Sequence, residues 1–390
     1  MNPVCRVLTT ASLCLLACTD AIGPPTAPGP DLAADQANPA TSIVVFSRNL
    51  YVGANLDAVL AALVTPDPAD DFPALLAALE TLGATDFAVR AQAIADEIAQ
   101  TRPMVIGLQE VSRLEVDLTP FGVSIAFTID FEPILYAALA DRGLDYDVAA
   151  QNTNIDLDAL PGPAVMALRD KEVLLVRADV SPVAAGNKSY DICLHPVPGS
   201  CPITIPYPVP ISRGFVWARI VLDGVPWTFV STHSESGNSA DVAAIRAVEI
   251  GELVTAFGSA PGPVVMMGDF NDRPEADPWP SPDAYDLITG AGGFTDFWRA
   301  KHPGATGFTC CHAPDLTNPL GTALDERIDF VFVRGGPGHA FGSIRRSGAT
   351  PSSRIAGPVY PIWPSDHAGL AAELLLPSEG GSAHGAQERP

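Results

Sequence analysis

The chain has little positive charge. Its 390 residues include 22 Lys and Arg against 45 Asp and Glu, a formal net charge of -23 at pH 7. A field of this sign favours solubility and repels polyanions at long range. Nucleic acid is therefore not favoured as a partner, although a local basic cluster or a bound metal can offset the field. The candidates for such a cluster are Arg169, Lys171, Arg177 and Arg213.

The sequence also lacks an internal repeat and a glycine-rich loop of the kind that cradles nucleotide phosphates. Polar motifs are spread over the whole region from Ser42 to Leu376. We therefore predict one large α/β domain over 42–376, rather than two small ones, and expect a monomer. The tail 377–390 is polar and rich in glycine, and is predicted to be disordered.

The first 18 residues are predicted to be an export signal. Arg6 precedes an apolar stretch, Val7 to Ala17, that is too short to span a bilayer as a stable helix. Leu15 to Cys18 resembles the lipobox of bacterial lipoproteins, in which the cysteine is acylated after cleavage; an ordinary secretory signal is the alternative. Residues 19–41 are rich in Pro, Ala and Gly and are predicted to form a tether. We expect an exported protein that is anchored to a bacterial membrane through Cys18.

Cysteines are few outside this signal. Cys193, Cys201, Cys310 and Cys311 would lie in an oxidising compartment, and their even number suggests disulfides. Cys193 and Cys201 flank a short Pro-rich loop, so a bridge between them is the first choice. The adjacent pair Cys310 and Cys311 leaves three alternatives open: a vicinal bridge, two buried thiols or, with His312, a metal site.

Apolar runs predict two strand-helix-strand units. In the first, the strands Ile43 to Phe46 and Met104 to Leu108 flank a helix that Asp86 can cap. In the second, the strands Trp227 to Ser231 and Pro263 to Met267 flank a helix that Ser239 or Asp241 opens. Such units deliver the residues after their strands to one edge of a sheet. Further strands are predicted at Val173 to Val176, Phe215 to Leu222 and Ile328 to Val333.

Short polar motifs follow or enter these strands in a fixed order. Their carboxylate and amide oxygens are the ligands that Mg²⁺ prefers, with Mn²⁺ as an alternative. A divalent cation of this kind can bind a phosphate and its attacking water, which points to phosphoester hydrolysis. That reaction also needs a base for the water and an acid for the leaving oxygen. The motifs are Asn49, Gln109-Glu110, Lys171-Glu172, Ser231-Thr232-His233, Gly268-Asp269-Phe270-Asn271, Arg327-Ile328-Asp329 and Ser365-Asp366-His367.

Two histidines stand in these motifs, and an imidazole works best when a carboxylate fixes its tautomer. Glu172 is the candidate partner of His233, and Asp329 that of His367. Asp329 also lies within a continuous apolar run, and a buried carboxylate needs a partner. The remaining histidines are predicted to be surface residues: His195, His302, His312, His339 and His384.

On these motifs the chain resembles the endonuclease/exonuclease/phosphatase superfamily, from about Ile43 to Leu376. The resemblance implies a deoxyribonuclease I-like fold, a four-layered α/β sandwich with two mixed sheets packed face to face between helices. It also implies that Asn49, Glu110 and Asp366 hold the metal. The resemblance further implies that Asp269 and Asn271 position nucleophile and phosphate and that Asp329 orients His367, with Asp269 and His367 as alternatives for the base. It also implies that Glu172 supports His233 and that Arg213, after a disulfide loop, contacts phosphate.

The chain also departs from this superfamily. There is room for an extra helix around Phe72 to Leu82, and Glu115 to Pro133 is interpreted as a second insertion. Ser112 stands where the secreted deoxyribonucleases carry an Arg that contacts DNA. The insertions and Ser112 argue against DNA as the substrate. Insertions at strand tips can instead shape a pocket for a smaller or lipid-linked phosphoester.

The leading hypothesis is a Mg²⁺-dependent phosphodiesterase, nuclease-like or acting on a lipid, outside the cytoplasm. One alternative is a phosphomonoesterase acting on a sugar or inositol phosphate, which would need a closed basic pocket. The other is a non-catalytic surface protein that retains the fold.

Overall fold

The computed structural model describes residues 42–54, 58–59, 62, 70–157, 166–274, 284–319, 323–335 and 341–376. The predicted signal (1–18) with Cys18, the predicted tether (19–41) and the predicted tail (377–390) lie outside the described residues. Among the described helices, none combines the length and the apolar character that a membrane span requires.

The first sheet has eight strands within the described residues. β1 lies at its centre, parallel to β2 and antiparallel to β18. The path through the sheet is β15 (Phe341–Ser347), β18 (Gly369–Leu375), β1 (Ser42–Asn49), β2 (Val105–Gln109), β6 (Met166–Arg177), β3 (Arg113–Asp117) and β4 (Ala126–Asp130), with β5 (Tyr146–Leu157) paired to β6.

The second sheet has six strands within the same residues. Its central strands β11 and β12 are parallel, and the others are antiparallel to their neighbours. The order is β13 (Thr295–Asp296), β14 (Asp329–Arg334), β12 (Val264–Asp269), β11 (Val225–His233), β10 (Gly214–Leu222) and β7 (Ala184–Ser189).

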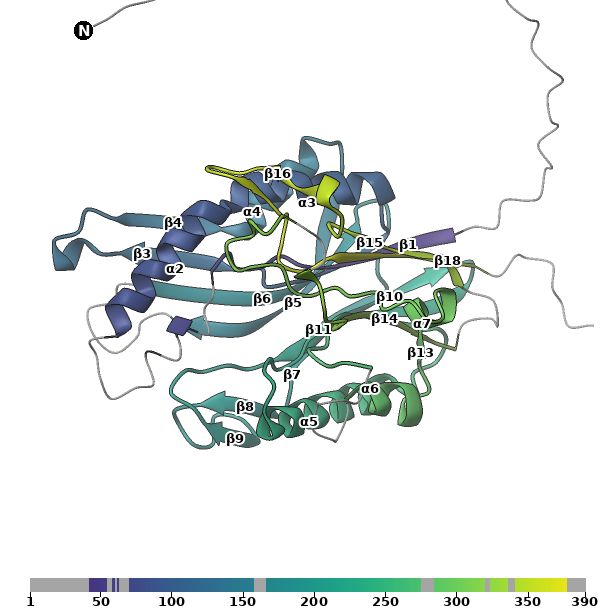
Figure 1. Ribbon diagram of the computed structural model, residues 1–390. Helices are drawn as coiled ribbons and strands as arrows, with labels where there is room; N and C mark the ends of the chain where they lie inside the picture. Colours follow the sequence, from purple (N-terminus) through teal and green to yellow (C-terminus); the bar gives the residue numbers. More distant parts are fainter. Residues whose placement is uncertain are drawn as a thin grey trace, which may run out of the picture. The chain divides into compact units, whose positions relative to one another are not determined.

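The two sheets pack face to face between two layers of helices (Figure 1). Val45 and Leu174 of the first sheet meet Phe229 and Met267 of the second in one buried cluster. Gly107 of β2 allows the two sheets to approach each other closely, because a Cβ at this position would lie 2.4 Å from Ser231 Oγ of β11. The outer face of the first sheet is covered by α3 (Phe87–Thr101) and α4 (Phe131–Ala140), and that of the second by α5 (Ala240–Phe257) and α6 (Ala284–Asp286). The predicted four-layered sandwich is confirmed.

Both predicted strand-helix-strand units are present. Asp86 caps α3 by accepting a hydrogen bond from the backbone N–H of Ala88, as the sequence predicts. Of the two residues that could open α5, Ser239 is the cap and accepts from the N–H of Val242. Asp241 lies in the first turn instead, where its charge favours the helix dipole. Each helix thus starts where its side chain satisfies an otherwise unpaired N–H group.

The two predicted insertions have regular structure. The first forms α2 (Asp71–Thr85), which contributes Leu75 and Leu82 to a hydrophobic cluster at one end of the first sheet. The second forms the hairpin of β3 and β4 and then enters α4. Two small sheets complete the described structure: β16 (Ile355–Ala356) with β17 (Pro361–Ile362), and β8 (Ile192–His195) with β9 (Ile203–Pro206). A sixth α-helix of the described part, α7 (Phe297–Lys301), packs on β14 and β15.

Both pairs of cysteines are bonded. The predicted bridge between Cys193 and Cys201 is confirmed, and it joins β8 to the loop before β9. Of the three alternatives for Cys310 and Cys311, the structure has the vicinal bridge.

Candidate active site

Strand register brings the predicted motifs to the same level of the two sheets. In the first sheet Asn49 of β1 lies beside Gln109 of β2. In the second sheet Asp269 of β12 lies between His233 of β11 and Asp329 of β14. Because the two sheets face each other, residues that are more than 200 positions apart in the chain converge on one point, as with Asn49 and Asp269.

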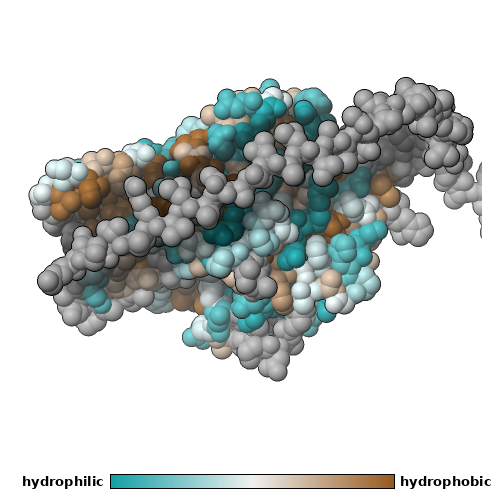
Figure 2. Space-filling model, turned by 45° about the horizontal axis from the view of Figure 1, so that its top comes forward, coloured by the Kyte–Doolittle hydropathy of each residue, from teal (hydrophilic) through white to brown (hydrophobic). Residues whose placement is uncertain are grey.

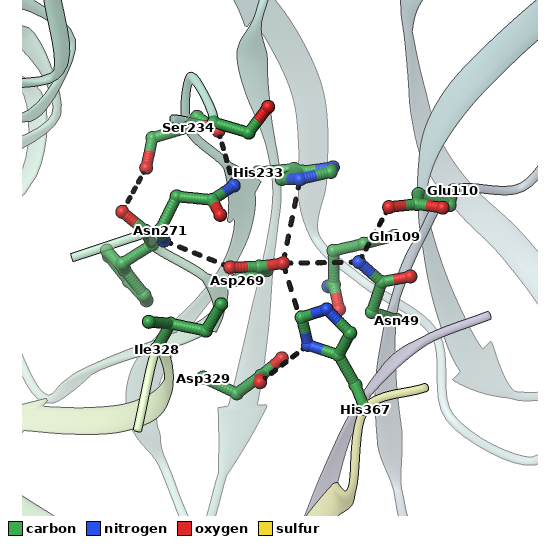
Figure 3. A network of polar contacts seen from close by, with 12 residues as sticks. Asn49, Gln109, Glu110, His233, Ser234, Asp269, Asn271, Ile328, Asp329 and His367 are labelled. Carbon is green, nitrogen blue, oxygen red and sulfur yellow. Dashed lines mark hydrogen bonds and ion pairs between the residues drawn. The ribbon is translucent and has the colours of Figure 1, made fainter. Parts of the chain in front are cut away.

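The carboxylate of Asp269 is the centre of the site (Figure 3). Its Oδ2 accepts a hydrogen bond from Asn49 Nδ2 at 3.1 Å and lies 3.6 Å from His233 Nε2 and 3.7 Å from His367 Nδ1. Its Oδ1 accepts from the backbone N–H of Asn271 at 3.0 Å. Burial and the nearby charge of Asp329 raise the pKa of Asp269 to about 7. Asp269 can therefore take up and release a proton near neutral pH.

Asp329 orients His367, as predicted. His367 Nδ1 lies 2.9 Å from Asp329 Oδ2, and both side chains are almost fully buried. Burial lowers the pKa of His367, but the carboxylates of Asp329, Asp269 and Asp366 outweigh burial and hold its pKa well above the usual value. His367 is thus a buried cation whose Nδ1–H donates to Asp329.

His233, unlike His367, is neutral. Burial, together with the charges of Arg213 and His367, holds its pKa well below the usual value. Its Nδ1 lies 3.3 Å from Arg213 Nη1, and guanidinium nitrogens only donate, so Nδ1 is the acceptor. The neutral ring therefore carries its proton on Nε2, which faces Asp269. Arg213 is held in turn by Glu235, at 3.3 Å. A cavity lies at the site, and Arg213 lines it together with His233 and Asp269.

Glu172 does not contact His233. It accepts a hydrogen bond from Ser231 Oγ and another from Gln109 Nε2, while its second oxygen has no hydrogen-bond partner. The predicted support of His233 by Glu172 would require a direct contact, and the structure shows no hydrogen bond between them. The side chain of Glu172 projects between the sheets, below the strand ends, toward Gln109 and Ser231. Burial raises the pKa of Glu172 to about 8.

Asn49, Glu110 and Asp366 form a group of oxygen donors next to Asp269. Asn49 Nδ2 donates to Glu110 Oε1 at 3.0 Å, and Glu110 Oε2 accepts from the N–H of Val52. Glu110 and Asp366 line the same cavity. Burial and the charge of Glu110 raise the pKa of Asp366 to about 6, so the two carboxylates repel each other. A divalent cation would relieve this repulsion, and carboxylate and amide oxygens suit a hard ion. Glu110 and Asp366 offer carboxylate oxygens to such an ion, whereas Asn49 turns its Nδ2 toward Glu110 and Asp269 and its Oδ1 accepts a hydrogen bond from the N–H of Tyr51 at 2.9 Å.

The backbone is unusual at two of these positions. Glu110 has φ 54° and Asn271 has φ 48°, a region that non-glycine residues seldom adopt. Hydrogen bonds compensate at Asn271, whose N–H binds Asp269 and whose Nδ2 donates to the carbonyl of Ser234 at 2.9 Å. Left-handed residues cluster at functional sites, where the surroundings hold them in place.

Several residues of this site were not predicted from the sequence. Asp170 is buried and accepts hydrogen bonds from Ser112 Oγ at 3.0 Å and Asn154 Nδ2 at 3.4 Å. Burial and Glu110 raise its pKa to about 7. Alternation along β6 was the available signal, because Asp170 shares the face of Glu172. Glu235, the partner of Arg213, lies two residues after His233, but nothing in the motif pointed to it.

Arg90 was also missed, although it holds the loops that carry the ligands. It is fully buried in α3 and donates to the carbonyls of Leu50, Tyr51, Thr85 and Pro364. The carbonyls of Leu50 and Tyr51 follow Asn49 and that of Pro364 lies just before Asp366, while Thr85 ends α2. Its place on the apolar face of the helix, four residues before Ile94, was the available signal.

One prediction about histidines is wrong. His312 is not a surface residue: it is 3% exposed and stacks on the ring of Trp363, with centroids 3.8 Å apart. Its N–H donates to the carbonyl of Asp366, so the segment after Cys311 belongs to the wall of the site. His195 and His302 are half-buried, and His339 and His384 lie outside the described residues.

No basic cluster forms around the site in the described part of the chain. All four candidate residues bind carboxylates: Arg169 pairs with Asp156, Lys171 with Glu132, Arg177 with Asp179 and Arg213 with Glu235.

A comparison with models of known protein families agrees with the geometry of the candidate active site. The model of the Endonuclease/Exonuclease/phosphatase family matches residues 80–367. The chain therefore belongs to this family, whose name covers three kinds of phosphoester hydrolase.

Solved structures share the fold at low sequence identity. An endonuclease/exonuclease/phosphatase from Beutenbergia cavernae is 18% identical, with a TM-score of 0.53 over 86% of this chain and 72% of that chain. A family protein from Bacteroides thetaiotaomicron is 18% identical, with a TM-score of 0.50 over 88% of this chain and 99% of that chain. TDP2 from D. rerio, complexed with a single-strand DNA product, is 15% identical, with a TM-score of 0.48 over 86% and 99% of the two chains. No curated protein matches the chain significantly.

The raised pKa of Glu172 predicts a change in pH-dependent stability. Between the unfolded value of 4.5 and the folded value of about 8, the folded state binds more protons than the unfolded state. Stability contributed by this group therefore falls as pH rises through that window, by at most about 1.4 kcal/mol per pH unit. In Glu172→Gln we expect the free energy of unfolding to fall less between about pH 5 and about pH 8, measured by urea denaturation.

The same change at an exposed glutamate of α2, Glu80→Gln, is the control and should keep the wild-type pH dependence. A Glu172→Gln profile that runs parallel to that of the wild type would show that Glu172 is ionised in the fold throughout this window.

Proposed function

We propose that the protein is a Mg²⁺-dependent phosphodiesterase. The observation that carries the proposal is the convergence on one cavity of a metal-capable donor set, a carboxylate with a near-neutral pKa, a neutral histidine and a cationic histidine. Family membership supports phosphoester hydrolysis. Mg²⁺ is proposed over softer ions because the donors Asn49, Glu110 and Asp366 offer oxygen.

The side chains divide the chemistry among them. A bound divalent cation would stabilise charge on the phosphoryl and leaving oxygens. Asp269 accepts the proton of the attacking water, since its pKa lies near neutrality and Asn49 and Asn271 fix its orientation. His367 is protonated, is held by Asp329 through Nδ1, and supplies the proton for the leaving oxygen. His233 donates its Nε2–H to a phosphoryl oxygen, and Arg213 keeps it in that tautomer.

Diester cleavage is proposed over monoester cleavage because a dianionic phosphate would require more positive charge. Arg213 is the one arginine or lysine among the described residues that line the cavity, and Glu235 already pairs with it. The alternative of an inert surface protein is less well supported, since the predicted ligands and both histidines lie in one site.

We also propose that the protein acts outside the cytoplasm and is anchored to a membrane through acylated Cys18. The sequence from Leu15 to Cys18 and the disulfide between Cys193 and Cys201 support this.

Metal binding should depend on Glu110. In Glu110→Gln we expect the affinity for Mn²⁺ or Mg²⁺, measured by isothermal titration calorimetry, to fall at least about tenfold, because a charged ligand is lost. Glu80→Gln should bind as the wild type does. Equal affinities in all three proteins would place the metal elsewhere, and the absence of binding in the wild type would favour an inert scaffold.

Hydrolysis of bis(4-nitrophenyl) phosphate with Mg²⁺ should be abolished by chelation. In Asp269→Asn and Asp329→Asn we expect kcat to fall by roughly 10² to 10⁴, because one variant loses the base and the other loses the partner of His367. Asp147→Asn, the same change at an exposed position of β5, should retain activity. Chelator-insensitive turnover, or equal rates in all variants, would contradict the proposal. Faster turnover of 4-nitrophenyl phosphate than of the diester would favour the phosphomonoesterase.

Acylation should require Cys18. A clickable fatty acid fed to cells that express the full chain should label the wild type and Cys14→Ala but not Cys18→Ala. Equal labelling of the two variants, or none in the wild type, would contradict the lipid anchor and leave the catalytic proposal untouched.

A further inference from the structure

The cavity at the site has two chemically different parts. Its volume is about 580 Å³, within the range of roughly 300 to 1,000 Å³ typical of small-molecule sites. One part is the phosphoryl-transfer site, with Glu110, Asp269 and His367. The other part is lined by aliphatic and aromatic side chains that the chemistry does not use, among them Val52, Leu157, Met166, Leu168, Val209 and Ile211.

One face of β6 shows how the polar part becomes the apolar part. Alternate residues of a strand share a face, and these are Glu172, Asp170, Leu168 and Met166. All four are buried. Glu172 lies between the sheets and Asp170 lies beside Glu110 and Arg213, while Leu168 and Met166 continue the wall. At about 3.3 Å per residue, the apolar wall extends roughly 13 Å beyond Asp170.

The rest of the wall of this part comes from other segments. Leu157 of β5 pairs with Leu168, and Val209 and Ile211 come from the connection between β9 and β10. Tyr51 and Val52 follow the strand end that carries Asn49. All these residues belong to one hydrophobic cluster, which α2 backs with Leu75 and Leu82. One departure from the superfamily, the extra helix α2, thus supports the apolar part from behind without lining it.

Asp170 marks the boundary between the two parts. Its oxygens accept hydrogen bonds from Ser112 and Asn154, so the carboxyl group is held at the edge of the polar site. A bulge in β5 between Thr153 and Ile155 leaves Asn154 outside the regular pairing with β6, and its side chain reaches Asp170. Bulges re-aim side chains next to active sites in this way.

Charge on the cavity wall disfavours a polyanion. Within the described lining, the cationic side chains of Arg213 and His367 are outnumbered by the carboxyl groups of Glu110, Asp170, Glu235, Asp269, Glu326 and Asp366. Nucleic-acid sites instead align several cations along the phosphate backbone. A substrate with one phosphodiester group, neutralised by the metal, and an apolar group beyond it matches both parts of the cavity. Figure 2 shows apolar side chains gathered beside a deeper hydrophilic patch on this face.

We propose that the apolar part of the cavity binds the alkyl or acyl chain of an amphiphilic phosphodiester while its phosphate lies at Asp269. This inference rests on the proposed phosphodiesterase function and specifies its substrate class. Each buried methylene should raise kcat/KM about three- to fourfold until the chain fills the cavity.

A series of alkyl 4-nitrophenyl phosphates tests the proposal with Mg²⁺ and the full chain. Water attacks phosphorus, the bond to the nitrophenyl oxygen breaks, and alkyl phosphate and 4-nitrophenol are released. Methyl, butyl and octyl esters are compared below their micellar concentrations, because binding to micelles would raise the rate independently of the cavity. We expect kcat/KM to rise at least about a hundredfold from methyl to octyl.

Two variants place a charge in the apolar part. Ile155→Asp and Leu194→Asp alter half-buried lining residues, so the fold is less at risk than with a buried position. In each we expect the ratio of octyl to methyl kcat/KM to fall at least about tenfold, because the chain would desolvate the new carboxylate. The matched control is Val221→Asp on β10, an exposed valine that does not line the cavity, and it should keep the wild-type ratio.

The outcomes separate the two proposals. Turnover of the methyl ester without a gain for the octyl ester would overturn the chain-binding inference and leave the phosphodiesterase intact. A gain that persists in both lining variants would also overturn the inference, because the chain would then bind elsewhere. Absence of turnover on all three esters would count against the phosphodiesterase itself. Circular dichroism and urea denaturation of each variant show whether a lost preference reflects unfolding.

Discussion

The site depends on the face-to-face packing of two sheets, and the carboxylate of Asp269 is the point at which polar groups of both sheets converge. Asn49 and His367 reach it from segments of the first sheet, and Asp269 itself ends a strand of the second. His367 is bound at the same time to Asp329, again across the two sheets. A shift of one sheet against the other by a single residue would therefore move the base, Asp269, away from both the cationic His367 and the proposed ligand Asn49.

Buried negative charge is the cost of this arrangement. Burial raises the pKa values of Asp170, Asp269 and Asp366, and repulsion between neighbouring carboxylates adds to it. Positive charge from His367 offsets part of the cost, and a divalent cation would offset more. Groups with pKa values near neutrality are characteristic of catalytic sites, so the same repulsion that destabilises the fold provides a base.

The sequence predicted the strands and helices that carry the motifs, because their apolar periodicity and caps are local properties. It also predicted the pairing of Asp329 with His367, since a carboxylate inside an apolar run needs a partner. It failed for Glu172 and His312. A strand pattern shows which residues share a face, but not whether that face meets a histidine or a serine of another sheet. His312 is buried because its segment packs against Trp363, a residue 51 positions later.

The order of the motifs by itself predicted the family, the fold class and the residues around Asp269, but not Asp170, Glu235 or Arg90. Each of these predictions uses the residue types at the ends of strands, and the strands themselves are recognised from apolar runs that are local in the chain. Only the tertiary structure decided the charge states of the two histidines, the place of Asp170 and the apolar part of the cavity. These properties depend on desolvation and on distances between remote segments, and neither quantity is encoded in local sequence.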